Sequence, residues 1–526
     1  MRRTIDRDAR GAVRRPAPWL WLALALLAAS LAACARNPVT GRREAVLQTE
    51  RGEIEQGDAA AAEVAAQIGL LEEPELRAYI DALGQRLAKQ SPRTQLVHRF
   101  EIVMMQEPNA FALPGGHIYV SRGLLELVDS EDELATVIGH EIGHVAARHS
   151  VARQTANAPL APVRILAGIG GAATSIVAPG VGSLVTGLGQ LPGALALAAY
   201  SREQEREADR LGQQYAAATG FDPSALAKFM ETLTREEAMA GADPNRRSFF
   251  ASHPRSPERS RDAVEFAKTL TIAVVTPPAL ERAAFLERLD GMLVGASAAE
   301  GVFIEERFLH ADLGVGLSFP KQWETLNAPQ AVAAIQKERL GQVIVQLVAE
   351  GADPMETALA FDKEIRLATA PRRLQINGLS AAQAEAELSQ NGERLRVLIT
   401  WVAHRERIYQ IAGMASRRNF ESLRATLSEV ALSFHELDDA ERAEVKQDRL
   451  RIATARAGET LAELGERTGN RWSVERTALA NALEPDAKLA AGALVKIAVA
   501  EPFVGRDPAA SGGGETAAKK EAPAKK

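Results

Sequence analysis

The sequence of 526 residues holds a single cysteine, Cys34, so no intramolecular disulfide can form. Aromatic residues are also scarce, at 5% of the chain, and positive charge is not in excess, because the formal net charge is −6. The first 33 residues carry six arginines and two aspartates, a net +4, so the rest of the chain carries about −10. We expect no nucleic acid partner for so acidic a chain.

The apolar run at residues 19–33 is too short to be a convincing membrane-spanning helix. It follows an arginine-rich start, and Leu31-Ala32-Ala33-Cys34 resembles a bacterial lipobox. We therefore expect lipid attachment at Cys34 after removal of a signal peptide; an uncleaved anchor and simple secretion are the alternatives. Because Ala35 is not aspartate, resemblance to lipoprotein sorting in Gram-negative bacteria implies the periplasmic face of the outer membrane.

The composition is otherwise that of a globular protein. Hydrophobic residues make up 46% of the chain and charged residues 25%, enough for buried cores. A chain of this length should contain roughly two to four domains. The sequence predicts an α+β multidomain protein in six segments: a signal peptide at 1–33, a tether at 34–58, a mainly helical domain at 59–295, an α+β domain at 300–438, a small domain at 449–500 and a disordered tail at 504–526.

One helical turn, His140-Glu141-Ile142-Gly143-His144, carries the strongest chemical signal. Two imidazoles four residues apart on a helix lie one above the other, so both can face one metal ion while Glu141 reaches the metal-bound water. This pattern is a zinc-hydrolase signature, and the alternative is an amphipathic helix with incidental histidines. Gly139 and Gly143 each weaken a helix by about 1 kcal/mol against alanine, so we expect another backbone to approach closely there.

A catalytic zinc needs a third protein ligand and leaves its fourth position to water. The best candidate is Glu205, which shares a helix face with Asp209 and with small residues that indicate close packing. Asp209 would then accept the N–H of a ligand imidazole. The alternative for Glu205 is an ordinary solvated carboxylate, which is how Glu203 and Glu207 are interpreted.

Four motifs in order carry a family resemblance: 109–116, the turn at 140–144, Glu205-x-x-x-Asp209 and Ser252-His253-Pro254. Over roughly residues 60–285 the chain resembles the HtpX and CAAX-prenyl-protease family of zinc endopeptidases, and among them the soluble periplasmic members. The resemblance implies a zincin-type, gluzincin-like domain with a small sheet. It also implies one zinc ion per chain, bound by His140, His144 and Glu205, with Glu141 as general base.

The same resemblance implies that His253 lies near the metal, either stabilising the oxyanion or occupying the open position as a latch, with Arg259 as a supporting cation. By itself, His253 would be interpreted as an ordinary loop histidine. His149 is interpreted as a structural or surface residue near the helix end.

Residues 100–104 and 117–120 are strand candidates. In this family such a strand borders the cleft, where a substrate backbone can pair along it. Asn109 is a candidate substrate contact, with a turn-forming asparagine as the alternative. The charge-free stretch at 165–201 is expected to form packed helices that cover the cleft; a membrane-spanning hairpin is the other possibility.

Beyond residue 300, strands are expected at 313–320, 343–347, 395–401 and 407–411, and helices at 354–369 and 418–433. The Phe-Pro-x-x-Trp element at 319–323 weakly resembles the PsbP or Mog1 type of sheet. His310, His404 and His435 share no metal spacing and are interpreted as structural.

Residues 449–500 resemble a LysM module, which implies a βααβ fold that binds N-acetylglucosamine glycans such as peptidoglycan. The first strand lacks the usual aromatic residue, so a LysM-like fold used for protein contacts is the alternative.

The sequence as a whole favours a lipid-anchored periplasmic zinc endopeptidase. By family resemblance, its substrates are misfolded or stalled envelope proteins. One alternative is a chaperone or assembly factor for outer-membrane proteins with a latent zinc site. A cell-wall hydrolase is less favoured, because wall peptidases linked to LysM modules commonly use an H-x-H element that this chain lacks.

Overall fold

The computed structural model describes residues 34–41, 43–45, 48–157, 199–241, 249–254, 257–328, 331–338, 340–390 and 393–505. The expected signal peptide, nearly all of the charge-free stretch at 165–201 and the tail from residue 506 lie outside the described residues. Among the residues that are described, no helix combines the length and the apolar character needed to cross a membrane.

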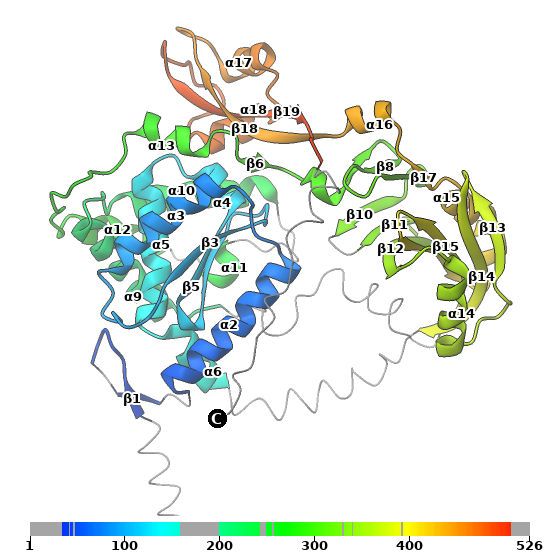
Figure 1. Cartoon of the computed structure of the whole chain (residues 1–526). Helices are drawn as coiled ribbons and strands as arrows, with labels where there is room; N and C mark the ends of the chain where they lie inside the picture. The colour runs from blue at the N-terminus through cyan, green and yellow to red at the C-terminus, as the bar shows by residue number, and fades with distance from the viewer. Residues whose placement is uncertain are drawn as a thin grey trace, which may run out of the picture.

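The N-terminal body packs helices around a three-stranded sheet of order β3-β5-β4 (Figure 1). The strands at 100–104 and 117–120 are confirmed as β3 and β5, which run parallel; the short β4 pairs antiparallel with β5 and was not predicted. The described elements of this body are α2 (Glu50–Gln67), α3 (Pro74–Ala88), β3 (Arg99–Val103), β4 (Ala110–Leu113), η1 (Pro114–Gly116), β5 (His117–Ser121), α4 (Arg122–Leu127), α5 (Glu131–Ala146), α6 (His149–Asn157), α9 (Arg202–Ala218), α10 (Ala225–Ala240), α11 (Phe249–Ser252), α12 (Pro257–Ala267) and α13 (Arg282–Leu289).

The predicted tether at 34–58 is wrong over its last nine residues, because α2 already begins at Glu50. The Thr49 side chain caps this helix by accepting from the Gly52 N–H. Glu53 is buried and forms an ion pair of 2.7 Å with buried Arg93, so this segment is packed on the body. Upstream, β1 (Cys34–Arg36) pairs with β2 (Arg43–Ala45).

Helices α5 and α9 approach each other closely through their glycines. A Cβ built on Gly139 would lie 2.9 Å from the Gly212 carbonyl oxygen, and one on Gly212 would lie 2.6 Å from the His140 nitrogen. At Gly143 the neighbouring backbone is that of Ala208, at 3.2 Å. The predicted close approach of a second backbone is therefore confirmed, and it places the two metal-binding motifs against each other.

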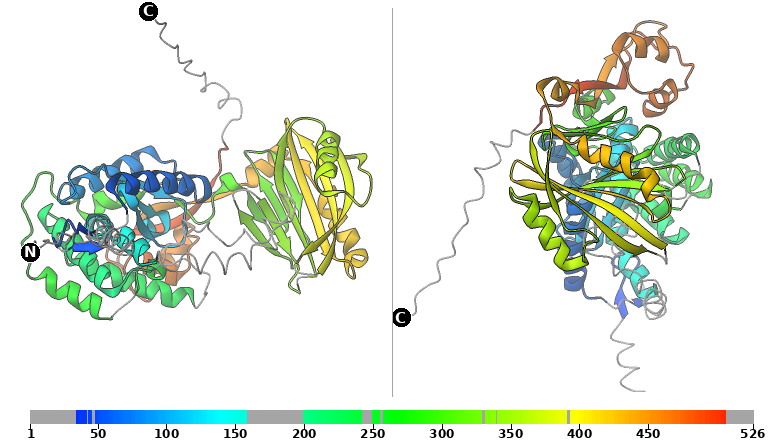
Figure 2. Two further views of the ribbon diagram at one scale, coloured as in Figure 1. Left: turned by 90° about the horizontal axis from the view of Figure 1, so that it is seen from below. Right: turned by 90° about the vertical axis from the view of Figure 1, so that its right-hand side faces the viewer.

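Residues 298–445 form a separate sheet-rich domain beside this body (Figure 2). Its larger sheet has the order β10-β11-β12-β16-β15-β14-β13 and its smaller sheet the order β17-β9-β8-β7. The described elements of this domain are β7 (Val302–Ile304), β8 (Arg307–His310), β9 (Val315–Ser318), β10 (Glu324–Ala328), β11 (Ala331–Ile335), β12 (Gly341–Glu350), α14 (Pro354–Ile365), β13 (Arg372–Ile376), β14 (Leu379–Gln390), β15 (Glu393–His404), β16 (Arg407–Ser416), α15 (Phe420–Leu432), β17 (His435–Glu436) and α16 (Asp439–Glu444). The expected elements are present with somewhat different ends, as β9, β12, β15, β16, α14 and α15. The other elements were not predicted.

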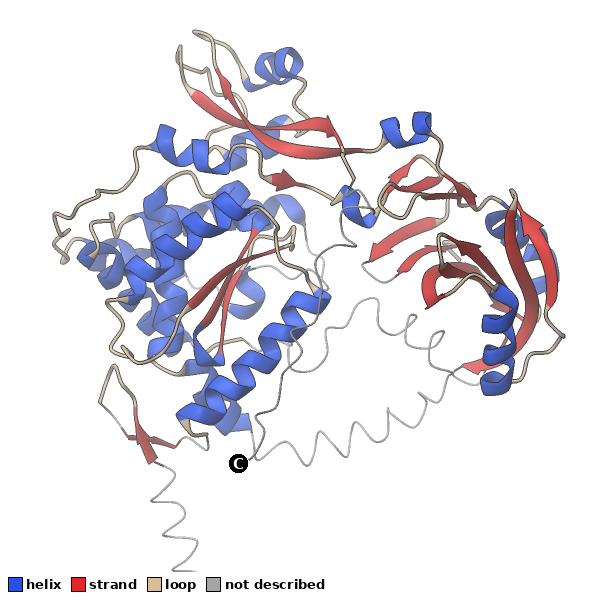
Figure 3. Cartoon of the chain, in the orientation of Figure 1, coloured by secondary structure: helices blue, strands red, loops and turns tan. Residues whose placement is uncertain are grey.

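The C-terminal unit has the expected βααβ order, in β18 (Lys446–Thr454), α17 (Leu461–Thr468), α18 (Val474–Ala480) and β19 (Leu494–Pro502) (Figure 3). Its strands extend a sheet that also contains β6 (Leu293–Val294) from the end of the N-terminal body. Leu450, Leu479 and Ala498 belong to the same hydrophobic core as the residues of α5. The βααβ unit is thus packed as part of the N-terminal body, and residues 298–445 are inserted between β6 and β18.

Candidate metal centre

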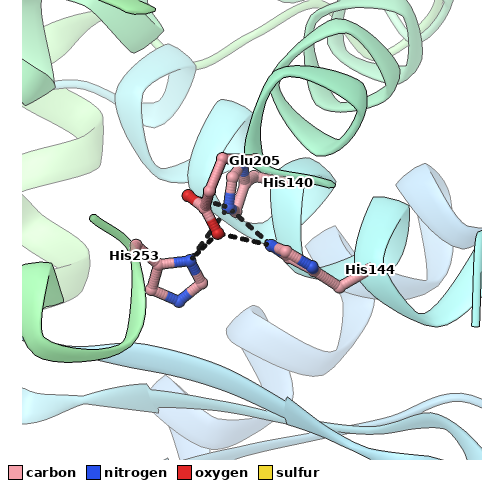
Figure 4. A group of neighbouring side chains, drawn as sticks. All are labelled: His140, His144, Glu205 and His253. Carbon is pink, nitrogen blue, oxygen red and sulfur yellow. Dashed lines mark hydrogen bonds and ion pairs between the residues drawn. The ribbon is translucent and has the colours of Figure 1, made fainter. Parts of the chain in front are cut away.

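Four side chains from three helical segments converge at one buried point (Figure 4). Helix α5 supplies His140 and His144, α9 supplies Glu205, and His253 follows the short helix α11. All four are almost completely shielded from solvent, with exposed fractions of 1% or less. The structure therefore brings together the three predicted ligands and the histidine that the resemblance placed near them.

The four donor atoms all lie within 4.8 Å of one another. His140 Nε2 is 3.0 Å from His144 Nε2 and 3.3 Å from His253 Nδ1. Glu205 Oε1 is 3.0 Å from His253 Nδ1 and 3.4 Å from His144 Nε2. The group is thus compact around a single centre.

This spacing fits a tetrahedral zinc ion. Zinc bonds to nitrogen and oxygen are about 2.0–2.1 Å long, so the donors of a tetrahedral site stand about 3.3 Å apart. Two imidazole acceptors facing each other in a buried pocket are also poor partners without a cation between them. We conclude that His140, His144 and Glu205 fit the metal, with His253 Nδ1 at the position of a fourth ligand.

Asp209 lies behind His140, on the side away from the centre. Its Oδ1 lies 2.9 Å from His140 Nδ1, so the imidazole presents Nε2 to the centre. The Asp209 carboxylate in turn accepts two hydrogen bonds from Arg259, both of 2.8 Å. Although burial favours the neutral acid, Arg259 lowers the pKa of Asp209 below its ordinary value.

The resemblance implied a supporting cation at Arg259, and the structure places its guanidinium on the two carboxylates of α9. Its guanidinium is spread over Asp209, Glu205 Oε2 at 2.6 Å and the Pro254 carbonyl oxygen at 3.2 Å. The side chain is buried and its donors are used by these groups. It therefore orients the two carboxylates of α9 and neutralises their charge.

The electrostatics of the centre are those of a site built for a cation. Burial alone would raise the pKa of Glu205, but His253, His144 and His140 hold it well below its ordinary value. Burial lowers the pKa of His253, yet Glu205 and Glu141 outweigh it and raise the pKa above its ordinary value. For His144, burial dominates and lowers the pKa, which favours the neutral imidazole that can bind a metal.

Glu141 lies beside the four donors without joining them. Its Oε1 is 3.5 Å from His253 Nε2, and the side chain is fully buried. Burial raises the pKa of Glu141, while the charges of His253 and His140 oppose this shift. A carboxylate so placed can exchange a proton with a molecule held at the centre.

The strand at the edge of the sheet beside α5 is β4, and the expectation that a strand of this sheet borders a substrate cleft stays a prediction. β5 is paired on both sides, with β3 and β4, so it has no free edge for a substrate. β4 is an edge strand of the sheet and packs against α5. Asn109, just before β4, is buried, and among the described residues its Oδ1 has no hydrogen-bond partner. Its role in substrate binding stays a prediction.

Three further residues lie around the centre. Of the two interpretations of His149, structural or surface, the structural one is confirmed, because the residue is buried and its Nδ1 lies 2.9 Å from His144 Nδ1. Glu207 is not simply solvated, because its Oε2 lies 3.2 Å from His149 Nε2. Tyr200 stacks on His144 with ring centroids 3.9 Å apart, and no sequence motif indicated it.

Within the described residues, His310, His404 and His435 join no metal cluster.

Comparison with known proteins decides the family. The model of Peptidase family M48 matches residues 74–267, which contain the whole centre. The beta-barrel assembly-enhancing protease of Yersinia pestis is 32% identical over 213 residues, or 40% of this chain and 43% of that protein. The putative beta-barrel assembly-enhancing protease of Vibrio cholerae is 30% identical over 344 residues, or 63% of this chain and 68% of that protein. The chain belongs to peptidase family M48.

M48 peptidases are zinc metalloendopeptidases, and the matched region carries the buried donors that such an enzyme needs. A mitochondrial metalloendopeptidase of Schizosaccharomyces pombe is 29% identical over 188 residues, or 36% of this chain and 52% of that protein. The chain covers less than half the length of the first curated relatives that it matches, among them the Yersinia pestis protein. The alignment with the Yersinia pestis protein is about as long as the M48 region, whereas the alignment with the Vibrio cholerae protein extends beyond it.

The resemblance of the chain to solved structures is distant. Cyanobacterial PsbP from Synechocystis sp. PCC 6803 covers 27% of this chain and 98% of its own, at 14% identity and a TM-score of 0.22. The Ran-binding protein Mog1p of Saccharomyces cerevisiae covers 27% of this chain and 99% of its own, at 10% identity and a TM-score of 0.20. Scores this low carry no argument about residues 298–445, so the PsbP or Mog1 resemblance stays a prediction.

Proposed function

We propose that this M48 chain is a zinc-dependent endopeptidase of the bacterial cell envelope that degrades misfolded or stalled envelope proteins. One observation carries the proposal: three protein ligands and Glu141 surround a buried point with the spacing of a tetrahedral metal site. The envelope location rests on the lipobox-like segment that ends at Cys34. The relatives named as beta-barrel assembly-enhancing proteases support the choice of substrate class.

When bound, zinc would supply the Lewis acid that activates a water molecule for attack on the scissile carbonyl. Glu141 takes the proton of the attacking water and returns it to the leaving amine. Its raised pKa suits a group that must hold this proton midway through the reaction. A substrate backbone paired along the outer edge of β4, with which no strand of the described residues pairs, would lie beside Glu141, and main-chain pairing requires no strict sequence.

With a metal bound, His253 would make the enzyme latent in the conformation described here. Its Nδ1 lies with the three ligand atoms and would occupy the place that a catalytic site leaves to water. It also stacks on Phe249, with ring centroids 4.4 Å apart, which holds the imidazole in place. Cleavage therefore requires that the His253 segment move away from the metal.

The first experiment measures zinc content and casein cleavage of the mature chain carrying Cys34→Ala, beside Glu141→Gln and Glu205→Ala. We expect about one zinc per chain in the first two proteins and much less in Glu205→Ala, with cleavage absent from Glu141→Gln. Wild-type protein that binds no zinc would overturn the proposed function.

The His253 latch predicts that His253→Ala raises casein cleavage while zinc stays bound, because a water molecule replaces the displaced imidazole. Combining it with Glu141→Gln should abolish the gain and serves as the control for contaminating protease. If His253 instead stabilises the oxyanion, cleavage should fall on the order of 10²-fold, which is typical for loss of one such donor. A fall would therefore refute the latch.

The latch also favours a second candidate, an assembly factor or chaperone whose zinc site stays latent. In a deletion strain, this candidate predicts that Glu141→Gln restores outer-membrane protein assembly as well as wild type does. The protease proposal predicts that Glu141→Gln fails to restore the clearance of misassembled proteins.

Binding of the C-terminal βααβ unit to peptidoglycan is a further proposal, tested by cosedimentation of the mature chain with purified cell walls.

A further inference from the structure

His144, unlike His140, is backed by another histidine instead of a carboxylate. Its Nε2 faces Glu205 and His140, so its Nδ1 points away from the centre. There it lies 2.9 Å from Nδ1 of His149, whose Nε2 lies 3.2 Å from Glu207 Oε2. His149 is 3% exposed, so water does not replace these contacts.

The chain reaches this arrangement through a break between α5 and α6. In a continuous helix His149 would point about 140° away from His144, since five residues turn through about 500°. Arg148 instead adopts a left-handed conformation with φ of 57°, which is uncommon for a residue other than glycine. Its side chain is tied to Glu53 by a 3.0 Å hydrogen bond and to the Gln48 carbonyl oxygen. The turn folds His149 back onto His144.

The positions of the hydrogens follow from the role of each nitrogen. If His144 Nε2 binds the metal through its lone pair, Nδ1 carries the hydrogen and donates it. His149 Nδ1 must then accept, so its hydrogen is on Nε2 and is donated to Glu207. The chain of bonds therefore runs from His144 Nδ1–H to His149 and from His149 Nε2–H to the Glu207 carboxylate.

We propose that His149 and Glu207 are positioning residues for the zinc site, an inference that rests on the proposed function. They fix the tautomer and ring orientation of His144, as Asp209 does for His140. The two ligand imidazoles are thus oriented by two carboxylates of the same helix, α9, one directly and one through His149. Tyr200 closes the remaining side: its ring stacks on His144 and its hydroxyl lies 3.1 Å from Ser150 Oγ.

The test measures zinc affinity by competition with a chelator, using the mature chain with Cys34→Ala. His149→Leu removes the acceptor, and we expect zinc to bind about 10- to 100-fold more weakly, as for other groups behind a metal ligand. His149→Asn keeps a side-chain oxygen close to the lost nitrogen and should recover most of the affinity. Glu207→Leu should weaken binding, and Glu207→Gln, which still accepts a hydrogen bond, should weaken it less.

Glu203→Leu is the matched control, because Glu203 lies on the same helix and its side chain is 79% exposed. Thermal unfolding of the zinc-free proteins separates positioning from packing, and it should be similar for wild type, His149→Asn and Glu207→Gln. Unchanged zinc affinity in His149→Leu, or equal losses in His149→Leu and His149→Asn, would overturn the proposal. If His149→Leu does not fold, the comparison of Glu207→Leu with Glu207→Gln decides. Failure of the proposed function is distinct from all of these results, because wild type itself would then bind no zinc.

Discussion

At the scale of single residues, His98 shows how burial makes the body sensitive to acid. It lies beside Arg93 at the start of the sheet, and burial, aided by the Arg93 charge, lowers its pKa to about 4. In the unfolded chain the pKa is about 6.5. Between these values the unfolded chain binds more protons, so stability falls as the pH falls from about 6.5 to 4.

We expect this histidine to cost up to about 3 kcal/mol of unfolding free energy over that range. His98→Phe keeps an aromatic ring but cannot be protonated, so its stability should depend less on pH. Denaturant unfolding of wild type and variant at pH 7 and pH 4.5 measures the difference. The same pH dependence in both proteins would show that His98 is protonated in the folded state.

Residue spacing was enough to predict only those site residues that share one regular helix. His140 with His144, and Glu205 with Asp209, are four residues apart and so lie on one face. The contact of His149 with His144 was not predicted, because it depends on the left-handed conformation of Arg148, which no local pattern indicates. His253 was placed by family resemblance alone, since it comes from a segment more than 100 residues away from α5.

At the scale of helices and strands, the contact of α5 with α9 limits which residues the two metal helices can carry. A methyl group on Gly212 would lie 2.6 Å from the His140 nitrogen, which is main chain and cannot rotate away. We therefore expect Gly212→Ala to lower the unfolding free energy by about 1–3 kcal/mol and to weaken zinc binding, because the helices must separate. Thermal unfolding and chelator competition measure the two effects.

Gly465→Ala is the matched control for that substitution. Gly465 lies inside helix α17, and a Cβ there would meet nothing closer than Asn470 Cβ at 3.8 Å. Alanine should raise stability there by about 0.5–1 kcal/mol through helix propensity. If Gly212→Ala and Gly465→Ala changed the unfolding free energy in the same direction, close approach of α5 and α9 would not explain the glycine at position 212.

The strand β4 was missed for a reason that applies to short buried elements in general. All four of its residues are buried, so the alternation that reveals a half-exposed strand is absent. Strands β3 and β5 have five residues each and were predicted from β-branched and aromatic residues. The edge that we assign to the substrate was therefore out of reach of sequence patterns.

At the scale of the whole molecule, buried charges fasten the βααβ unit to the metal-bearing body. Lys496 is fully buried and donates to the Val128 carbonyl oxygen at 2.5 Å, just before α5 begins. Burial lowers the pKa of Lys496 to about 8. Arg476 pairs with buried Glu126 of α4. Breaking such a buried pair by removing one partner costs about 3–5 kcal/mol.

The sequence predicted the βααβ order of this unit but presented it as an independent domain. Its resemblance to a LysM module rests on residues within 449–500, whereas its attachment rests on contacts with residues hundreds of positions earlier. Arg449, for example, donates to Glu73 at 2.6 Å. Long-range pairing of this kind leaves no periodic signal in the sequence.

The βααβ unit shares a hydrophobic core with the N-terminal body, whereas the inserted domain does not. We therefore expect opposite outcomes when one or the other is deleted. β6 and β18 are antiparallel neighbours, with Val294 paired to Asp448, so a short turn can join them in place of residues 298–444. This excision should leave zinc content and casein cleavage close to wild type, because the inserted domain has hydrophobic cores of its own. Removal of 446–526 should instead abolish zinc binding or soluble expression, because it opens the core around α5 and leaves Glu126 unpaired. A truncated chain that still binds zinc, beside an excised chain that does not, would mean that the inserted domain and not the βααβ unit supports the metal centre.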